Sequence, residues 1–127
     1  MKNITILISG SGTNLQRIID CIDNGKIRNA KINQVIADRE CFGLERAEKH
    51  NIPNQLIKRG KDFYENLEKA IPENTDLIVG PFFKSSVLEV LRFVNDKKIP
   101  VVAPFPRRST EIVKAVSFGS VELATIE

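Results

Sequence analysis

Two patterns of apolar and polar residues alternate along this chain, and they predict strands and helices in turn. Short, uniformly apolar runs are typical of buried strands, and the segments between them repeat their apolar residues every three or four positions. The pattern predicts strands at 4–8, 32–37, 55–58, 77–79 and 101–103, and helices at 13–23, 42–49, 61–70 and 86–95. After Pro106 the pattern is less regular, with a short helix at 110–116 and a last strand or helical turn at 121–126.

Strands that alternate with helices predict βαβ crossovers and a parallel sheet covered by helices on both faces. We therefore expect one three-layer α/β domain over residues 1–127, Rossmann-like or flavodoxin-like, with a mainly parallel sheet of five strands and room for a sixth. Gly25 is expected to end the first helix in a left-handed conformation, and residues 77–79 are expected to be buried on both faces.

Composition and charge exclude several classes of protein. The 19 basic and 16 acidic residues are interspersed, so the net charge of +3 describes a solvated surface and argues against a nucleic-acid partner. No apolar run approaches the roughly 18 residues that span a bilayer, and residues 2–8 lack the features of a signal peptide. We expect a cytoplasmic protein with no membrane partner.

Few side chains suggest metal or acid–base chemistry. Cys21 and Cys41 have no metal-ligand spacing and are expected to be free thiols, and no metal site or cofactor is predicted. His50 is the single histidine and stands at the end of a predicted helix, where a surface or capping role is favoured over catalysis.

The glycine-containing segment after the first strand is the strongest functional signal. A strand, a glycine turn and a helix follow one another, an arrangement that directs backbone N–H groups toward an anion. The predicted phosphate-binding residues are Gly10, Ser11, Gly12, Thr13 and Asn14. Gly12→Val is expected to place a branched side chain where the anion would lie and to strain the turn. We expect weak binding of phosphate or a sugar phosphate.

Other interpretations of this segment remain open. Gly10 and Gly12 match the start of a dinucleotide-binding fingerprint, and Asp38 at the end of the second strand offers a ribose acceptor. Leu15, however, stands where the third glycine belongs, and no Gly-Lys-Ser/Thr follows to make a Walker A loop. A glycine turn without a ligand is the remaining alternative.

Two segments resemble one known family. Ile8-Ser9-Gly10-Ser11-Gly12-Thr13-Asn14-Leu15-Gln16 is similar to the opening of the glycinamide ribonucleotide formyltransferases, folate enzymes of purine synthesis, and Phe42-Gly43-Leu44-Glu45-Arg46-Ala47 resembles their second helix. The resemblance runs from residue 1 to about residue 79. It implies the strand order 3-2-1-4-5 and places the phosphate of the ribonucleotide substrate at Gly12, Thr13 and Asn14.

The same resemblance implies missing catalytic groups. Where the family carries an Asn-Ile-His-Pro motif, this chain reads Val101-Val102-Ala103-Pro104, and it ends before the family's further aspartate. Aliphatic side chains neither transfer protons nor stabilise an oxyanion. We therefore expect no catalytic residues and no formyl transfer.

The segment 78–106 resembles a βαβ unit of type I periplasmic binding proteins, in the phrases Ile78-Val79-Gly80-Pro81 and Ile99-Pro100-Val101-Val102-Ala103-Pro104. Together the two resemblances favour a chimeric or designed scaffold, joined near residues 79–84, that has no natural catalysis and keeps a vestigial phosphate loop. The alternatives are a glycinamide ribonucleotide formyltransferase fragment or relative, and a small phosphate-ester or nucleotide binder. A monomer or a homodimer is expected.

Overall fold

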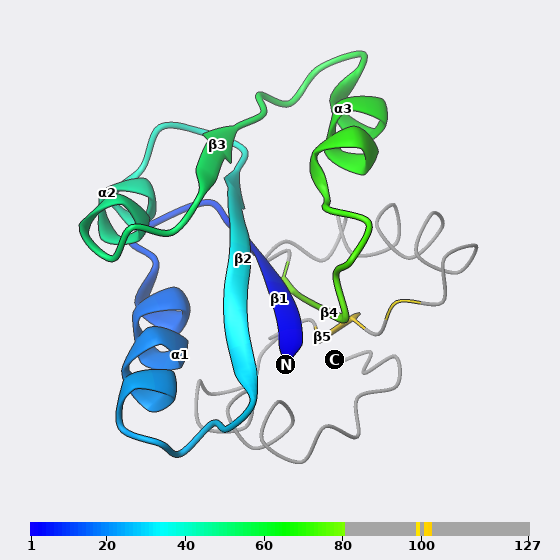
Figure 1. Cartoon of the computed structure of the whole chain (residues 1–127). Helices are drawn as coiled ribbons and strands as arrows, with labels where there is room; N and C mark the ends of the chain where they lie inside the picture. The colour runs from blue at the N-terminus through cyan, green and yellow to red at the C-terminus, as the bar shows by residue number, and fades with distance from the viewer. Residues whose placement is uncertain (81–98, 100, 103–127) are drawn as a thin grey trace.

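The computed structural model describes residues 1–80, 99 and 101–102, which alternate between strands and helices (Figure 1). The elements are β1 (Lys2–Ile8), α1 (Thr13–Asp23), β2 (Ala30–Ala37), α2 (Phe42–Lys49), β3 (Asn54–Leu56), α3 (Phe63–Ala70), β4 (Leu77–Val79) and β5 (Val101–Val102). The predicted helix at 86–95, the tail elements and the sixth strand lie outside the described residues.

The strands form one parallel sheet in the order β3-β2-β1-β4-β5. This confirms the predicted α/β class and the strand order. β1 lies in the middle, between β2 and β4, so its carboxyl end opens at the centre of one sheet edge. Whether residues 1–127 make a single domain stays a prediction, because the sheet accounts only for the described part of the chain.

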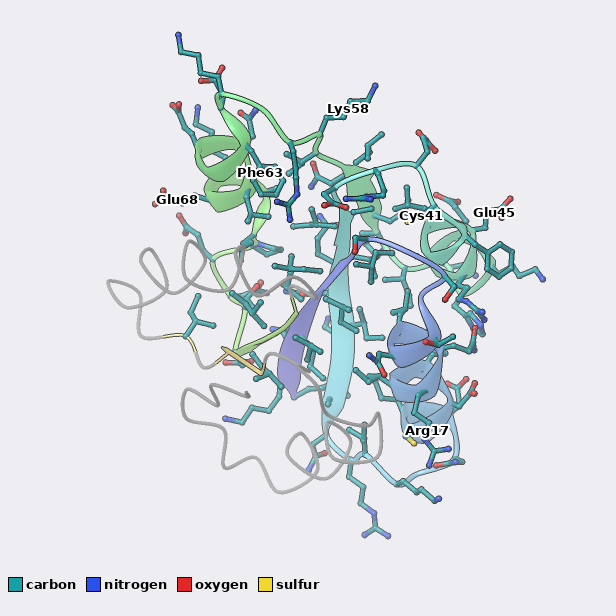
Figure 2. All side chains as sticks on the ribbon, turned by 180° about the vertical axis from the view of Figure 1, so that it is seen from behind. Arg17, Cys41, Glu45, Lys58, Phe63 and Glu68 are labelled. Carbon is teal, nitrogen blue, oxygen red and sulfur yellow. The ribbon has the colours of Figure 1, made fainter. Side chains whose placement is uncertain are left out.

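The sheet is covered on both faces because side chains of a strand alternate between its two faces. Ile4, Ile6 and Ile8 of β1 pack with α1 and the α2 side of the core, whereas Leu7 packs with α3. Figure 1 shows α1 and α2 on one side of the sheet and α3 on the other, and Figure 2 shows the same separation from behind, with Phe63 far from Arg17. All three residues of β4 are buried, as predicted for a strand between two helix layers.

β2 starts two residues earlier than predicted because Lys31 is charged and exposed, so the apolar run begins only at Ile32, and the strand contains a bulge. The register with β1 moves from Ile4 opposite Ile32 to Thr5 opposite Gln34, which leaves Asn33 as the extra residue. The buried Thr5 hydroxyl donates to Asn33 Oδ1 at 2.9 Å. Asn33, a polar residue inside the predicted strand, therefore satisfies a buried hydroxyl.

The first helix ends as predicted. Asn24 is its C-cap and donates its N–H to Asp20 O at 2.9 Å, and Gly25 follows with φ of 83°. Among the residues that the structure describes, no helix combines the length and the apolar character needed to cross a bilayer.

Leu67→Ala tests the packing of α3 on the sheet. Leu67 is 2% exposed within the apolar cluster between α3 and the strands. We expect the substitution to lower the free energy of unfolding by about 2–5 kcal/mol, since it removes buried methyl groups and leaves a cavity. Glu65→Ala on the same helix is the control: its side chain is 66% exposed in an ion pair with Lys69, so we expect a change within about 0.5 kcal/mol. Urea denaturation measures both, and equal effects would contradict the packing described.

Candidate functional site

The predicted phosphate-binding residues lie in the loop that joins β1 to α1 and in the first turn of α1. The loop leaves the sheet at the carboxyl edge and passes beside α2, as Figure 1 shows. Gly10, Ser11 and Thr13 are exposed, Asn14 is half-buried and Gly12 is buried. The structure therefore brings the five predicted residues together, with three of them open to solvent.

The start of α1 lacks the usual protein partners. Gly12 is the N-cap, with φ of 76° and ψ of 29°, and no side chain caps the helix. The first turn carries no acidic residue. The N–H groups of Thr13, Asn14 and Leu15 precede the first intrahelical hydrogen bond, which Gln16 N–H donates to Gly12 O at 2.9 Å. Free N–H groups and about half an elementary positive charge at a helix start favour an anion there.

A close approach between two glycines fixes this loop against α2. A Cβ atom on Gly12 would lie 2.7 Å from Gly43 Cα and 3.3 Å from Arg46 Cδ. A Cβ on Gly43 would collide with Ile8 Cδ1 and would lie 3.1 Å from Gly10 O. Gly43 N–H also donates to Gly10 O at 3.1 Å. Both glycines are thus required by the contact of α2 with the loop.

This contact changes the reason for which Gly12 is sensitive. The sequence predicted that a side chain there would occupy the place of the anion. In the structure the Cβ direction leads into α2, against Gly43 and Arg46, and φ of 76° adds strain for any other residue. At Gly10, by contrast, a Cβ would meet nothing within 4 Å.

Arg46 on α2 is the residue of this site that sequence reasoning missed. Its Nε donates to Ser11 O at 2.6 Å and its Nη1 donates to Gln16 Oε1 at 3.1 Å. The sequence analysis named Arg46 only as part of a segment that resembles the second helix of the formyltransferases. The pairing joins residues 35 positions apart, and no local pattern reports such a contact.

The Asp38 carboxylate forms ion pairs with two arginines. Its Oδ2 accepts from Arg59 Nε at 2.9 Å and its Oδ1 accepts from Arg39 Nε at 3.1 Å, while the Asp38 side chain is only 8% exposed. The hydrogen bond and the charge of Asp38 raise the pKa of the Arg39 guanidinium. With a third bond from Arg39 Nη2 to Oδ2 at 3.3 Å, the arginines use most acceptor sites of this nearly buried carboxylate, so the structure does not favour the dinucleotide interpretation.

The other candidate groups of the sequence are His50 and the two cysteines. His50 is the C-cap of α2 and lies at the end of that helix away from Gly43, which agrees with the predicted capping role. Cys21 is buried and Cys41 is half-buried, and both are free thiols, as predicted. Within the described part of the chain, no three His, Cys, Asp or Glu side chains gather as a metal site would require.

Comparison with known proteins gives a consistent result. Residues 2–84 match the formyl transferase family. The phosphoribosylglycinamide formyltransferase of Haemophilus influenzae is 39% identical over 100 residues, 78% of this chain and 43% of that protein. The protein of that name from Dictyostelium discoideum is 48% identical over 60 residues, which are 46% of this chain and 29% of that protein.

Solved structures of the same name share the fold. The phosphoribosylglycinamide formyltransferase from Coxiella burnetii superposes with a TM-score of 0.58 at 35% identity, over 68% of this chain and 46% of that one. The structure from Anaplasma phagocytophilum gives a TM-score of 0.63 at 27% identity, over 80% and 48% of the two chains. The match thus covers less than half the length of each of these relatives.

These findings confirm the family resemblance and correct the functional interpretation. The view of the chain as a chimeric or designed scaffold without natural catalysis is wrong, because its relatives are natural phosphoribosylglycinamide formyltransferases. The leaning toward a non-enzyme is wrong for the same reason. The similarity also crosses the supposed join at 79–84: the Haemophilus alignment spans 100 residues, more than residues 1–79 contain. Ala103 and Pro104 of the expected catalytic segment lie outside the described residues.

Gly12→Ala tests the contact between the loop and α2. We expect it to lower the free energy of unfolding by about 1–3 kcal/mol, because the new Cβ meets the backbone of Gly43 in a left-handed conformation. Gly10→Ala adds the same atom in open space, and we expect a change within about 0.5 kcal/mol. Chemical denaturation of both variants decides the point, and a Gly10→Ala cost as large as that of Gly12→Ala would refute the described geometry.

Proposed function

The chain belongs to the formyl transferase family, and from that premise we propose that it takes part in formyl transfer to phosphoribosylglycinamide. In this proposal the loop of Gly10, Ser11, Gly12, Thr13 and Asn14 holds the phosphate of the substrate. The formyl group comes from a folate donor, as the resemblance to the family implies. The relatives named phosphoribosylglycinamide formyltransferase support the choice of substrate.

The observation that carries the proposal is the uncapped start of α1. A protein helix normally satisfies its first N–H groups with a side chain at the N-cap. Here the N-cap is Gly12, which has no side chain, and the first turn lacks an acidic residue. An external anion would supply the missing acceptors, and a phosphate monoester offers three oxygens on one group.

The loop has a binding role and no proton-transfer role. Formyl transfer to an amine requires a group that moves protons and donors that stabilise an oxyanion. His50, the single histidine of the chain, caps the far end of α2. Phosphate binding remote from the reacting amine contributes by orienting the substrate, and energy gained there lowers the entropic cost of the reactive geometry.

We place the protein in the cytoplasm. Both cysteines of the chain are unpaired, which fits a reducing compartment. A monomer or a homodimer remains the predicted state, and interspersed surface charges argue against a nucleic-acid partner.

Phosphate titration followed by amide NMR tests the binding role. We expect inorganic phosphate to shift the amides of residues 10–15 more than any others, with a dissociation constant in the millimolar range, equivalent to about 4 kcal/mol. Phosphoribosylglycinamide should produce the same shifts at lower concentration, since the rest of the molecule adds contacts. Shifts at residues 10–15 no larger than elsewhere at tens of millimolar phosphate would contradict the proposal.

Formyl transfer to phosphoribosylglycinamide, measured with a folate formyl donor, tests the reaction. The proton-transferring group must then lie outside the loop and be a residue other than His50. We expect turnover that scales with protein concentration and that inorganic phosphate inhibits competitively. Turnover that inorganic phosphate leaves unchanged would argue against the loop as the phosphate site. A complete lack of turnover together with a lack of phosphoribosylglycinamide binding would reject the proposed function.

A further inference from the structure

The Arg46 side chain contacts the loop that joins β1 to α1. Its Nε donates to Ser11 O at 2.6 Å, and its side chain passes over Gly12, where a Cβ would lie 3.3 Å from Arg46 Cδ and 3.6 Å from Arg46 Nε. Resting on the proposed function, we infer that Arg46 is a positioning residue for phosphate binding. It keeps the Ser11 carbonyl turned toward α2, which leaves the N–H groups at the start of α1 to face the anion.

The reasoning begins with the carbonyl groups of the loop. A carbonyl oxygen carries partial negative charge, so a carbonyl directed at a bound phosphate would repel it. Three consecutive carbonyls here each accept a hydrogen bond inside the protein: Gly10 O from Gly43 N–H, Ser11 O from Arg46 Nε and Gly12 O from Gln16 N–H. Of these three donors only Arg46 is a side chain, and only Arg46 is charged. A charged donor makes a shorter and stronger hydrogen bond than a neutral one.

Arg46 is itself held in place from several sides. Its Nη1 donates to Gln16 Oε1 at 3.1 Å, and Gln16 Nε2 donates in turn to Asp20 Oδ1 at 2.9 Å. The guanidinium carbon lies 4.7 Å from the centre of the Phe42 ring, a stacking distance for a cation on an aromatic face. Phe42, which is 51% exposed at the start of α2, thus has Arg46 as a packing partner.

The charge of Arg46 is not cancelled by a carboxylate in the described part of the chain. The ion pairs of Asp38 with Arg39 and Arg59, and of Glu65 with Lys69, do not involve Arg46. Glu45, its neighbour in sequence, is exposed on the outer side of α2 (Figure 2). A positive charge therefore stays next to the anion-binding end of α1, where it adds to the partial charge of the helix.

Substitution at residue 46 separates positioning from general electrostatics. Arg46→Gln removes both the charge and the reach to Ser11 O, whereas Arg46→Lys keeps the charge but has one donor nitrogen in place of the planar guanidinium. Lys49→Gln is the matched control, because it removes the same charge from an exposed position one turn further along α2. The probe is inorganic phosphate, titrated into each full-length protein at constant ionic strength and followed by the amide shifts of residues 10–15.

We expect Arg46→Gln to raise the dissociation constant of inorganic phosphate about tenfold. Arg46→Lys should raise it only about threefold, because the charge is kept. Lys49→Gln should change it by less than twofold. The melting temperature of Arg46→Lys should match that of the original protein within a few degrees, so that its weaker binding is not the result of unfolding.

The other outcomes separate an error in the role of Arg46 from an error in the proposed function. An unchanged dissociation constant in both Arg46 variants would overturn the inference while leaving the proposed function intact. An equal loss in Lys49→Gln would also overturn it, because the effect would then be one of net charge. Failure of the original protein to bind phosphate at residues 10–15 would instead reject the proposed function itself. If Arg46→Gln does not fold, Arg46→Lys and Lys49→Gln still decide between these outcomes.

Discussion

The contact between Gly12 and Gly43 is the constraint on which the site depends. No room for a Cβ exists at either residue, so the start of α1 and the start of α2 touch through their backbones. This contact brings Gly43 N–H to Gly10 O and Arg46 to Ser11 O, and the loop then has its carbonyls engaged on one side. The N–H groups of α1 are left for an external acceptor. In the proposed function, this helix start can serve as an anion site because a second helix fixes its orientation.

Much of the fold was predictable from the sequence because the strongest patterns are local. The predicted ranges agree with the bounds of α1, α2 and β4. Each of these segments has a recognisable apolar pattern, and a glycine, a polar turn or a proline marks its boundary. β2 was predicted too short at its start. Its first two residues precede the apolar run, because Lys31 is charged and exposed although it pairs with Asn3 of β1 in the sheet.

The interpretation of the chain as a chimera failed because buried strands of different parallel sheets resemble one another in sequence. Leu77-Ile78-Val79 and Val101-Val102 are short apolar runs in a parallel sheet, and burial on both faces selects the same few side chains in any such sheet. The resemblance of that region to another family therefore carried little information about ancestry. The loop of residues 10–14 could be predicted as a candidate phosphate site because its glycines and helix start are adjacent in sequence. The role of Arg46 was not recognisable, since it depends on a contact between distant residues.

The central claim is that phosphate binds at the start of α1. A crystal structure of the protein with phosphoribosylglycinamide tests it most directly. The account predicts the phosphate beside the loop, with its oxygens about 2.7–3.2 Å from the amide nitrogens of Gly12, Thr13 and Asn14, and with Arg46 still bonded to Ser11 O. A phosphate bound at another edge of the sheet, or a Ser11 carbonyl directed at the phosphate, would contradict it.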